Sequence, residues 1–506
     1  MMTLLFAYSG RSLAWLVAGG LIAASCAAAI AAAAQRDEPA DSPEPELRTW
    51  TDSSGKFQIE ASMLGFSDGK VQLEKADGSQ IAVPTSKLSK ADQQYVRQQL
   101  SRRREPGARS RRTESQPQPA ADDWPGWRGP NRDGKSADRG LLDQWPEGGP
   151  KPVWQASGIG QGFSSVAVAG GTVYITGDAD GRLVLSALDL EGKRKWQVPI
   201  DSAWTSNHPG ARSTPTVEGD RVYLLSGNGL LACVDAESGR SRWGRKAAEF
   251  GGRPGGWGYA ESVLIHGDLA VFKPGGRNAI VALNKKTGEP VWTSSGFEAG
   301  PEYSSSIAIE HQNRGMIITG TNRGIVAVDP ENGRMLWADA FSAGNTANCP
   351  TPAFADGYVF WANGYGKGGI CLRLDARGKQ VTAERAWETS EMDCHHGGYI
   401  LHEGYIYGNN KNGFVCLDLK TGQKRWEERV VGKGSLCFAD GMLYLFGERN
   451  GEAALATCSP EGTEVRGTLR VDGDGPSWAY PVVSGGRLYL RYDDNLYCYD
   501  VRRGGG

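Results

Sequence analysis

Apolar and polar positions alternate with a period of two along much of the chain, in short runs separated by turn residues. Three such runs lie between residues 48 and 100, at 57–61, 71–73 and 81–83, with Ser-Asp-Gly and Ala-Asp-Gly between them. A period of two predicts half-buried strands, and an Asp-Gly pair favours a tight turn. The stretch from Leu88 predicts one short helix with Ser89 as its N-cap. Segment 48–100 is therefore expected to form a small β-barrel.

A longer pattern repeats from residue 150 onward: a strand, a turn that contains glycine, and a strand that ends in tryptophan. The copies read ALDLEGKRKW (187–196), CVDAESGRSRW (233–243), ALNKKTGEPVW (282–292), AVDPENGRMLW (327–337), RLDARGKQVTAERAW (373–387) and CLDLKTGQKRW (416–426). The terminal tryptophans, at 154, 196, 243, 292, 337, 387 and 426, lie 39 to 50 residues apart. This spacing fits a four-stranded propeller blade, in which glycine supplies a positive φ and tryptophan packs on the next blade.

The two ends of this region predict how the ring closes. A seventh unit, 433–471, lacks the tryptophan, and an eighth starts at Trp478 and stops before its final strand. The sequence KPVWQA around Trp154 is a final strand without a unit of its own. Pairing the two ends completes a blade and removes an exposed sheet edge. The predicted fold is all-β: an eight-bladed β-propeller over 122–506, closed by N- and C-terminal strands, and a small SH3-like barrel over 48–100.

The N-terminal residues predict export. Residues 13–34 carry no charge, and a helix of that length reaches about 33 Å, enough to cross a bilayer. Ala32 and Ala34 fit a small-x-small cleavage site. Residues 1–34 are expected to be a cleaved signal peptide or an N-terminal anchor that associates with the membrane. The expected location is the periplasm or cell envelope.

Two further segments are predicted to be linkers. Residues 35–47 are acidic and rich in proline, and residues 101–121 are rich in arginine and end in a Pro/Gln tail. Such compositions cannot bury enough apolar surface to fold.

Charge and cysteine usage limit the function classes. The chain has 56 Lys+Arg against 58 Asp+Glu, which argues against a nucleic-acid partner. Three of the nine cysteines, Cys233, Cys416 and Cys498, occupy the repeat position where other copies carry Ala187, Ala282 and Ala327. A position that accepts Ala or Cys requires a small buried group. We expect mostly free, buried thiols, with one or two disulfides among the other cysteines as the alternative.

Two resemblances follow from these motifs. The repeat is similar to the quinoprotein-type signature A-x-D-x-x-T-G-x-x-x-W of PQQ-dependent alcohol dehydrogenases and the assembly factor BamB. WPGWRGPNRDG (124–134), GARSTPTVEGDRVY (210–223), HHGG (395–398) and GKGSL (432–436) resemble pieces of planctomycete PQQ-binding-like β-propeller repeat proteins. Segment 48–100 resembles the SHD-one domain through WTD, GKF, GF-x-DGKV, ADG and VP-x-x-KLS-x-AD. The second resemblance implies binding of short NPFxD-type peptides, as in endocytic adaptors, although a structural spacer is the alternative.

A candidate site follows from aligning the loops before the innermost strands. Three positions before each strand the chain carries Gly162, Arg212, Tyr259, Tyr303, Cys349, His395, Lys433 and Trp478. One position before, it carries Ser164, Thr214, Glu261, Ser305, Thr351, Gly397, Ser435 and Tyr480. Alternation predicts that both sets face one mouth of the central funnel. The predicted ligand-binding residues are Arg212, Tyr259, Glu261, Tyr303, His395, His396, Lys433 and Trp478.

Cations and aromatic rings at one mouth suit a flat or anionic ligand. The alternative is that these groups satisfy one another and fill the funnel. The resemblance to quinoproteins implies PQQ over calcium. The chain lacks the adjacent cysteines of those enzymes and has no Asp in either ring, so no cofactor is expected and PQQ is the weaker alternative.

The sequence DCHHGG invites a metal-site hypothesis with Cys394, His395 and His396 as ligands. Neighbours in an extended strand point to opposite sides, so the sequence predicts no metal site there. No G-x-S-x-G, P-loop or paired-carboxylate motif is present, and no catalytic residue is predicted.

The favoured function is an exported, non-catalytic scaffold or binding protein. The propeller would be a monomeric platform, and the barrel would bind a protein or peptide partner in the cell envelope. One alternative is a quinoprotein-like oxidoreductase with a diverged site around Arg212, Glu261, His395 and Lys433. A second alternative is a BamB-like envelope assembly factor.

Overall fold

The computed structural model describes residues 47–67, 70–75, 77–102 and 123–504, which form two compact units. The predicted signal or anchor (1–34) and almost all of both predicted linkers lie outside the described residues. Among the described helices, none combines the length and the apolar character that a membrane span requires. The two units are described separately.

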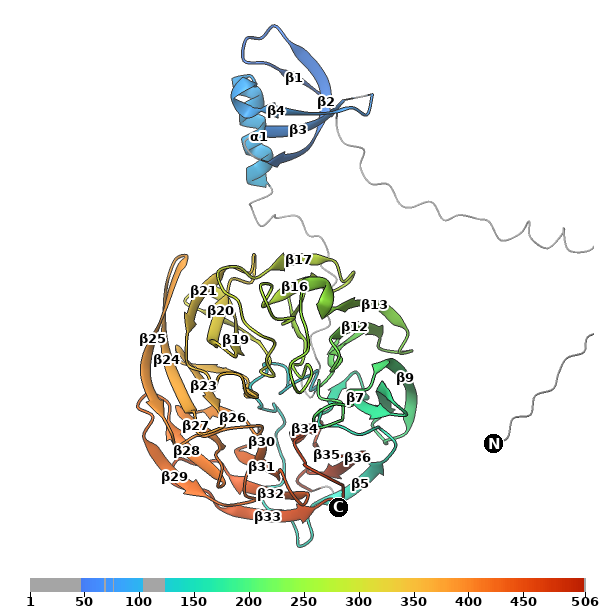
Figure 1. Cartoon of the computed structure of the whole chain (residues 1–506), viewed down its shortest axis with the longest axis vertical. Coiled ribbons are helices and arrows are strands. Elements are labelled where there is room, and N and C mark those ends of the chain that lie inside the picture. Colours follow the sequence, from blue (N-terminus) through green and yellow to red (C-terminus); the bar gives the residue numbers. More distant parts are fainter. Residues whose placement is uncertain (1–46, 68–69, 76, 103–122, 505–506) are drawn as a thin grey trace, which may run out of the picture. The chain divides into compact units, whose positions relative to one another are not determined.

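The first unit is a four-stranded antiparallel sheet with one α-helix (Figure 1). Its elements are β1 (Arg48–Thr51), β2 (Gln58–Ser67), β3 (Lys70–Lys75), β4 (Gln80–Pro84), the 3-10 turn η1 (Thr85–Lys87) and α1 (Lys90–Arg102). Ser89 caps the helix as predicted: its hydroxyl accepts a 3.2 Å hydrogen bond from the Asp92 backbone N–H. Trp50 is buried and meets Tyr95 of α1 edge-on at 5.7 Å. The alternation seen in the sequence thus places one face of the sheet under the helix.

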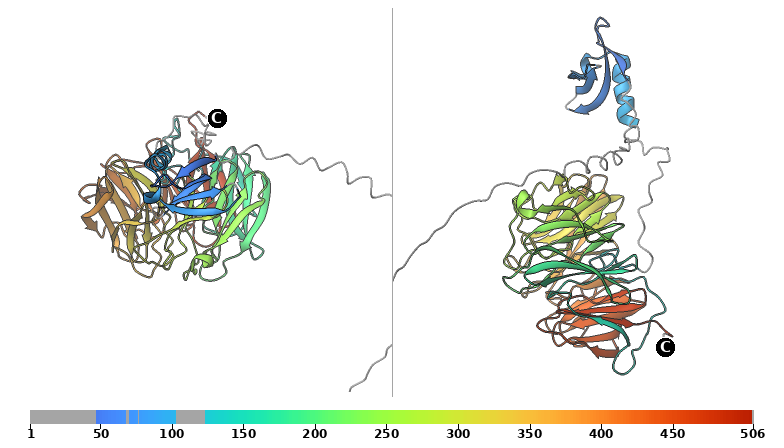
Figure 2. Two further views of the ribbon diagram at one scale, coloured as in Figure 1. Left: turned by 90° about the horizontal axis from the view of Figure 1, so that it is seen from above. Right: turned by 90° about the vertical axis from the view of Figure 1, so that its right-hand side faces the viewer.

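The second unit is a ring of four-stranded antiparallel sheets, eight in residues 123–504 (Figure 1). The side views show it as a disc (Figure 2). The first four sheets contain β6 (Ala167–Ala169), β7 (Thr172–Ala179), β8 (Arg182–Asp189) and β9 (Arg194–Ser202); β10 (Thr216–Glu218), β11 (Arg221–Leu225), β12 (Leu230–Asp235) and β13 (Ser241–Lys246), followed by η2 (Ala247–Phe250); β14 (Leu264–His266), β15 (Leu269–Phe272), β16 (Val281–Asn284) and β17 (Pro290–Thr293); and β18 (Ile307–His311), β19 (Arg314–Thr321), β20 (Gly324–Val328) and β21 (Met335–Asp339).

The other four sheets continue around the ring. They contain β22 (Ala353–Ala355), β23 (Tyr358–Asn363), β24 (Gly368–Arg377) and β25 (Gln380–Thr389); β26 (Tyr399–His402), β27 (Tyr405–Asn409), β28 (Phe414–Asp418) and β29 (Lys424–Glu428); β30 (Gly434–Ala439), β31 (Met442–Gly447), β32 (Glu452–Thr457) and β33 (Val465–Arg470); and β34 (Val482–Ser484), β35 (Arg487–Tyr492), β36 (Asn495–Asp500) and β5 (Lys151–Ala156).

The Ala/Cys position of the repeat lies opposite the tryptophan in the sheet. Cys233 of β12 is paired with Tyr223 on one side and Trp243 on the other, and a β-bulge follows it. The same register recurs at Cys498, between Tyr489 and Trp154. At Cys233 and Cys498 a small side chain fits between two large aromatic rings, whereas Ala282 and Ala327 lie between the tryptophan and an aliphatic residue, Val271 or Ile318. The eight cysteines within the described residues are all free, and six of them are buried.

The tryptophan of the repeat packs against the next sheet. The indole Nε1 of Trp243 donates a 3.1 Å hydrogen bond to the Lys285 carbonyl in the following sheet. Its ring lies over Gly288, which has a φ of +74°. The predicted packing of tryptophan against the next sheet is therefore confirmed, and the glycine serves both the turn and the close approach.

The ring closes by pairing β5 with β36, as the sequence predicts. Trp154 of β5 donates a 2.7 Å hydrogen bond to the Leu190 carbonyl of the first sheet, repeating the contact found elsewhere in the ring. Arg491 of β35, 2% exposed, donates to the carbonyls of Gly160 at 2.7 Å and Thr176 at 2.7 Å. These contacts join the last sheet to the first.

The segment 123–150 runs across the centre of the ring (teal in Figure 1) before it reaches β5. Arg132 donates hydrogen bonds of 2.8 and 3.0 Å to the carbonyls of Ser262 and Val263. Arg128 donates to the Tyr399 carbonyl, and Lys135 donates to the Leu401 carbonyl at 3.0 Å. The donors bond to backbone carbonyls at or next to innermost strands on different sides of the ring, so this segment crosses the central channel.

Candidate functional site

A cavity of about 210 Å³ opens where the innermost strands begin. It is lined by Trp127, Phe163, His208, Arg212, Trp257, Ala260, Tyr303, Ser305, Ala347, Cys349, Tyr365, His395, His396, Trp478 and Tyr480. Five of the predicted residues are among them: Arg212, Tyr303, His395, His396 and Trp478. The lining is aromatic and contains no carboxylate among the described residues. We call this space the aromatic cavity.

His395 and His396 lie side by side in the aromatic cavity. Their ring centroids are 3.6 Å apart, and Trp478 stacks on His396 at 4.2 Å. The prediction that neighbouring side chains diverge is wrong here, because the two residues lie in a bend before β26 and not in a strand. The glycines of HHGG make the bend: a Cβ on Gly397 would overlap the Gly434 carbonyl, and Gly398 has a φ of +67°.

The pair of histidines belongs to a wider group of polar atoms. Cys349, His395 and His396 each offer a ligand atom, and these three atoms lie within 4.8 Å of one another. Cys394, the cysteine considered from the sequence, is instead buried in the core, with its Sγ 3.5 Å from the Gly398 carbonyl. Burial lowers the pKa of His395 to about 3, so this ring is neutral.

Lys433 lies just outside the cavity lining and is paired within the protein. Its Nζ lies 3.1 Å from Glu448 and 3.3 Å from Nδ1 of His395. The same Glu448 carboxylate lies 3.8 Å from Nδ1 of His396. The cation predicted for an anionic ligand therefore already faces a carboxylate.

Arg212 lines the cavity but bonds to its own loop. Its guanidinium donates to the carbonyls of Gly210 at 2.6 Å, Asn207 at 2.9 Å and His208. Burial lowers its pKa to about 10, and Asp178 opposes this shift. Tyr303 lines the same wall, and its hydroxyl accepts a long 3.4 Å hydrogen bond from the Trp257 backbone.

Tyr259 and Glu261 are not part of the cavity, which corrects two predicted site residues. The loop 252–263 is irregular, so alternation does not hold, and its Trp257 and Ala260 face the cavity instead. A slip of one residue exchanges the two faces of an extended segment. The Tyr259 hydroxyl donates a 2.9 Å hydrogen bond to the Pro274 carbonyl.

Glu261, 1% exposed, accepts a hydrogen bond from the Lys273 backbone and lies 3.8 Å from that residue's Nζ. Burial raises the pKa of Glu261 and lowers that of Lys273. The Lys273 ammonium also donates to Thr319 Oγ1 at 2.9 Å. This pair lies beneath the surface as a structural ion pair.

Several lining residues were missed by the sequence analysis. Cys349 and Tyr480 belong to the two sets of residues aligned before the innermost strands, so the sequence carries a signal for both. Trp127 comes from the central segment, and its indole donates a 2.8 Å hydrogen bond to Thr351 Oγ1. Tyr365 is half-exposed at the rim with a φ of +59°, and its ring meets His395 edge-on at 4.7 Å. No repeat pattern marks Trp127 or Tyr365.

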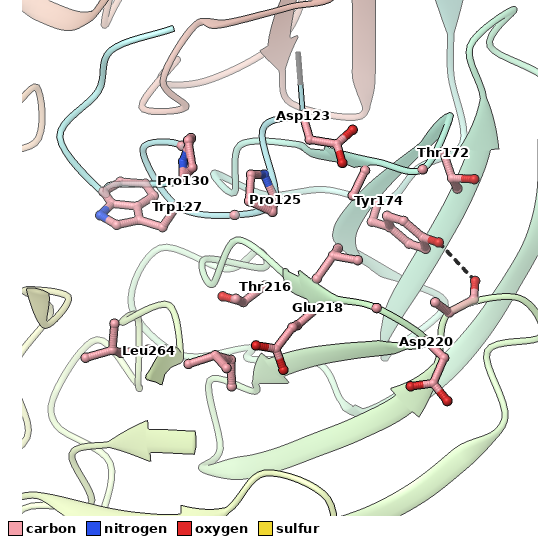
Figure 3. Close-up of a pocket in the computed structure, with 18 of the residues that line it drawn as sticks. Asp123, Pro125, Trp127, Pro130, Thr172, Tyr174, Thr216, Glu218, Asp220 and Leu264 are labelled. Atoms are coloured by element: carbon pink, nitrogen blue, oxygen red, sulfur yellow. Dashed lines mark hydrogen bonds between the residues drawn. The ribbon is translucent and has the colours of Figure 1, made fainter. Parts of the chain in front are cut away.

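A second cavity, of about 780 Å³, lies at the other end of the innermost strands, because it is lined by the residues that follow β6 and β10 and by β14 itself. Figure 3 shows Asp123, Pro125 and Trp127 of the central segment on one side and Glu218 and Asp220 on the other. Glu218 pairs with Lys285 at 2.7 Å, and Asp220 pairs with Arg242 at 2.7 Å. Trp127 borders both cavities and therefore separates them.

The aromatic cavity does not fit PQQ held over calcium. Hard cations require several oxygen ligands, and no carboxylate lines this cavity among the described residues. Glu261, the one carboxylate proposed from the sequence, is committed to Lys273. The grouped donor atoms are a thiol and two imidazoles, which are a different donor set.

Comparisons with known proteins match each unit separately. Residues 185–428 match the family model "Outer membrane protein assembly factor BamB", and residues 38–104 match "SLA1 homology domain 1, SHD1". The Actin cytoskeleton-regulatory complex protein SLA1 of Yarrowia lipolytica is 48% identical over 62 residues, which are 12% of this chain and 6% of that protein. The chain spans only 4 to 6% of the length of four fungal relatives of this kind. BamB of Moranella endobia is 22% identical over 306 residues, covering 56% of this chain and 74% of that protein.

Solved structures show the same propeller architecture. BamB from Moraxella catarrhalis has a TM-score of 0.53 at 16% identity, covering 70% of this chain and 98% of its own. Quinohemoprotein alcohol dehydrogenase from Comamonas testosteroni has a TM-score of 0.57 at 13% identity, covering 76% and 81%. Similarity at this level of identity establishes the fold and not the activity.

Proposed function

From a chain that carries a BamB-like propeller domain and an SHD1 domain, we propose a non-catalytic scaffold protein of the cell envelope. The eight sheets act as eight blades of a closed, rigid platform. The first unit binds a protein or peptide partner. The BamB relatives are named as assembly factors, and we propose a comparable role for this chain. The first unit is then a second binding module beside the propeller.

The observation that carries the proposal is the central segment 123–150, which crosses the channel. Arg128, Arg132 and Lys135 of the central segment bond to backbone carbonyls of the innermost strands. The predicted cations Arg212 and Lys433 are also committed, to loop carbonyls and to Glu448. A propeller whose centre is crossed by its own chain presents loops and sheet edges for recognition.

The first unit offers a specific anchor for a partner. Phe57 is 73% exposed, the largest exposed fraction among the large apolar side chains described. Its loop is held by Asp52, whose carboxylate accepts hydrogen bonds from the backbone N–H groups of Lys56 at 3.1 Å and Phe57 at 3.2 Å. An aromatic ring on an ordered loop loses little entropy on binding, which suits a binding hot spot.

Photo-cross-linking in cells tests this proposal. A photoreactive phenylalanine at position 57 of the full chain is expected to give one discrete adduct in the envelope fraction. The same residue at Val291, which is 52% exposed on β17 of the propeller, is the matched control for exposure. Equal and diffuse labelling from both positions would contradict a binding role for the first unit.

Titration with PQQ tests the alternative of an oxidoreductase. Tryptophan fluorescence is the readout, since Trp127, Trp257 and Trp478 line the aromatic cavity. We expect no saturable quenching, with or without Ca²⁺. Saturable binding that Arg212→Ala abolishes and Arg139→Ala retains would overturn the scaffold assignment.

A further inference from the structure

The aromatic cavity contains ring nitrogens whose partners the protein does not supply. Nε2 of His395 is buried and has no hydrogen-bond partner. Its Nδ1 faces Lys433. Nδ1 of His396 is also buried without a hydrogen-bond partner, and it lies 3.8 Å from the Glu448 carboxylate. Buried polar atoms without partners are uncommon and call for an explanation.

Cys349 brings a thiol to the same place from the neighbouring sheet. It lies in the loop before β22, whereas the histidines precede β26. The loop is ordered by Asn348, which is fully buried, accepts a 3.0 Å hydrogen bond from the Ala343 N–H and donates one of 2.9 Å to the Gly344 carbonyl. The Asn348 N–H in turn donates to Glu302 at 3.1 Å. The thiol is therefore held in position beside the two rings.

The imidazole rings are held as well. Trp478 stacks on His396 and Tyr365 meets His395 edge-on. The Glu448 carboxylate lies 3.8 Å from Nδ1 of His396, beyond hydrogen-bond distance, and places a negative charge beside the ring. Gly364 completes the fit, because a Cβ there would lie 3.0 Å from Cβ of His395.

We propose that Cys349, His395 and His396 form a three-ligand site for a thiophilic first-row transition ion of the Zn²⁺ or Cu⁺ class. Thiolate and imidazole are the donors that such ions prefer. The three ligand atoms already lie within 4.8 Å of one another. All three residues line the aromatic cavity, so the fourth coordination position faces that cavity and is open to water or a small donor. The site is independent of the scaffold role.

Lys433 places a positive charge of the protein beside the proposed metal site. Its ammonium lies 3.3 Å from Nδ1 of His395, and a positive charge beside a ligand ring opposes the charge of a metal ion bound there. Replacing Lys433 by methionine keeps the aliphatic length and removes the charge. We expect K433M to bind the metal several-fold more tightly than the natural chain.

The experiment uses the tag-free full chain, reduced and freed of metal. Titration with Co²⁺ is followed by the absorption of the cobalt–thiolate charge-transfer band, and competition with Zn²⁺ and Cu⁺ then decides which ion the site prefers. We expect one ion per chain. Cys349→Ser is expected to abolish the band, and His395→Gln and His396→Gln to weaken binding at least tenfold while each keeps the thiol.

Cys458→Ser and His208→Gln are the matched controls: the first removes another partly exposed thiol, and the second a histidine of the same cavity outside the cluster. Both are expected to bind as the natural chain does. Near-UV circular dichroism of each metal-free variant separates loss of ligand from loss of fold. Absence of a charge-transfer band at stoichiometric Co²⁺, or its persistence in folded Cys349→Ser, would overturn the proposal.

Discussion

The indole of Trp243 covers Gly288 of the following sheet so closely that a Cβ on this glycine would lie 2.8 Å from Cδ2 of the ring. The same contact joins Trp154 to Gly192, Trp292 to Gly333 and Trp387 to Gly422. The fixed spacing of Gly and Trp in the repeat therefore reflects a contact between neighbouring sheets. This contact determines which substitutions the propeller tolerates at the glycine positions.

Gly288→Ala is expected to lower the free energy of unfolding by about 2–4 kcal/mol, because it adds a clash with Trp243 to the strain of a positive φ. Gly441→Ala is the matched control. Gly441 has a φ of +79° but no atom within 4 Å of its hypothetical Cβ, so it should cost about 1 kcal/mol from strain alone. Equal losses in chemical denaturation would show that the indole contact contributes nothing.

Trp154→Phe is expected to lower the free energy of unfolding by about 1 kcal/mol more than Trp196→Phe does. This difference is the usual net contribution of one hydrogen bond. Trp154 donates to Leu190 across the closure of the ring, whereas Nε1 of Trp196 is buried without a partner. Both changes remove a similar packing area, so their difference isolates the hydrogen bond. Denaturant midpoints of the two variants measure it, and a larger loss from Trp196→Phe would contradict this assignment.

Arg132→Met is expected to destabilise the propeller by about 2–4 kcal/mol, since the Ser262 and Val263 carbonyls lose a buried charged donor. Arg139→Met is the control, because Arg139 is exposed and donates only to the carbonyls of Ala137 and Asp138 in its own segment. Thermal unfolding of both variants is the measurement. If the two melt alike, the central segment does not hold the ring.

The stability of the propeller is expected to fall as the pH rises from about 4 to about 6 through Asp178. Burial raises the pKa of this carboxyl to about 6, above its ordinary 3.8, and Trp204 N–H, Arg212 and Arg491 oppose the shift. The folded state therefore holds the proton more tightly than the unfolded state, and its stability is lost on deprotonation. Each pKa unit corresponds to about 1.4 kcal/mol, so after solvent screening the contribution is about 1–2 kcal/mol.

Asp178→Asn removes this titration while keeping an oxygen acceptor. The difference in unfolding free energy between the natural chain and this variant should change between pH 4 and pH 7 and stay constant above pH 7. A difference that is constant across the whole range would show that Asp178 does not titrate there.

The repeat made the ring predictable, because the Trp–Gly contact and the Ala/Cys position both depend on residues at fixed sequence spacing. The site was harder to predict for a physical reason. Alternation holds only where the chain is extended, and it failed at the irregular loop of Tyr259 and at the bend of His395 and His396. Trp127 could not be placed from the sequence, because its partner Thr351 lies 224 positions away and no periodic signal links them.

The pairing of β5 with β36 also sets the order in which this protein can be made. Gln155 and Tyr497 meet in the closing sheet although they lie 342 positions apart. While the ribosome elongates the chain, β5 has no partner until β36 has been translated. Early sheets can form on the nascent chain, but the ring itself closes only after β36 has left the ribosome.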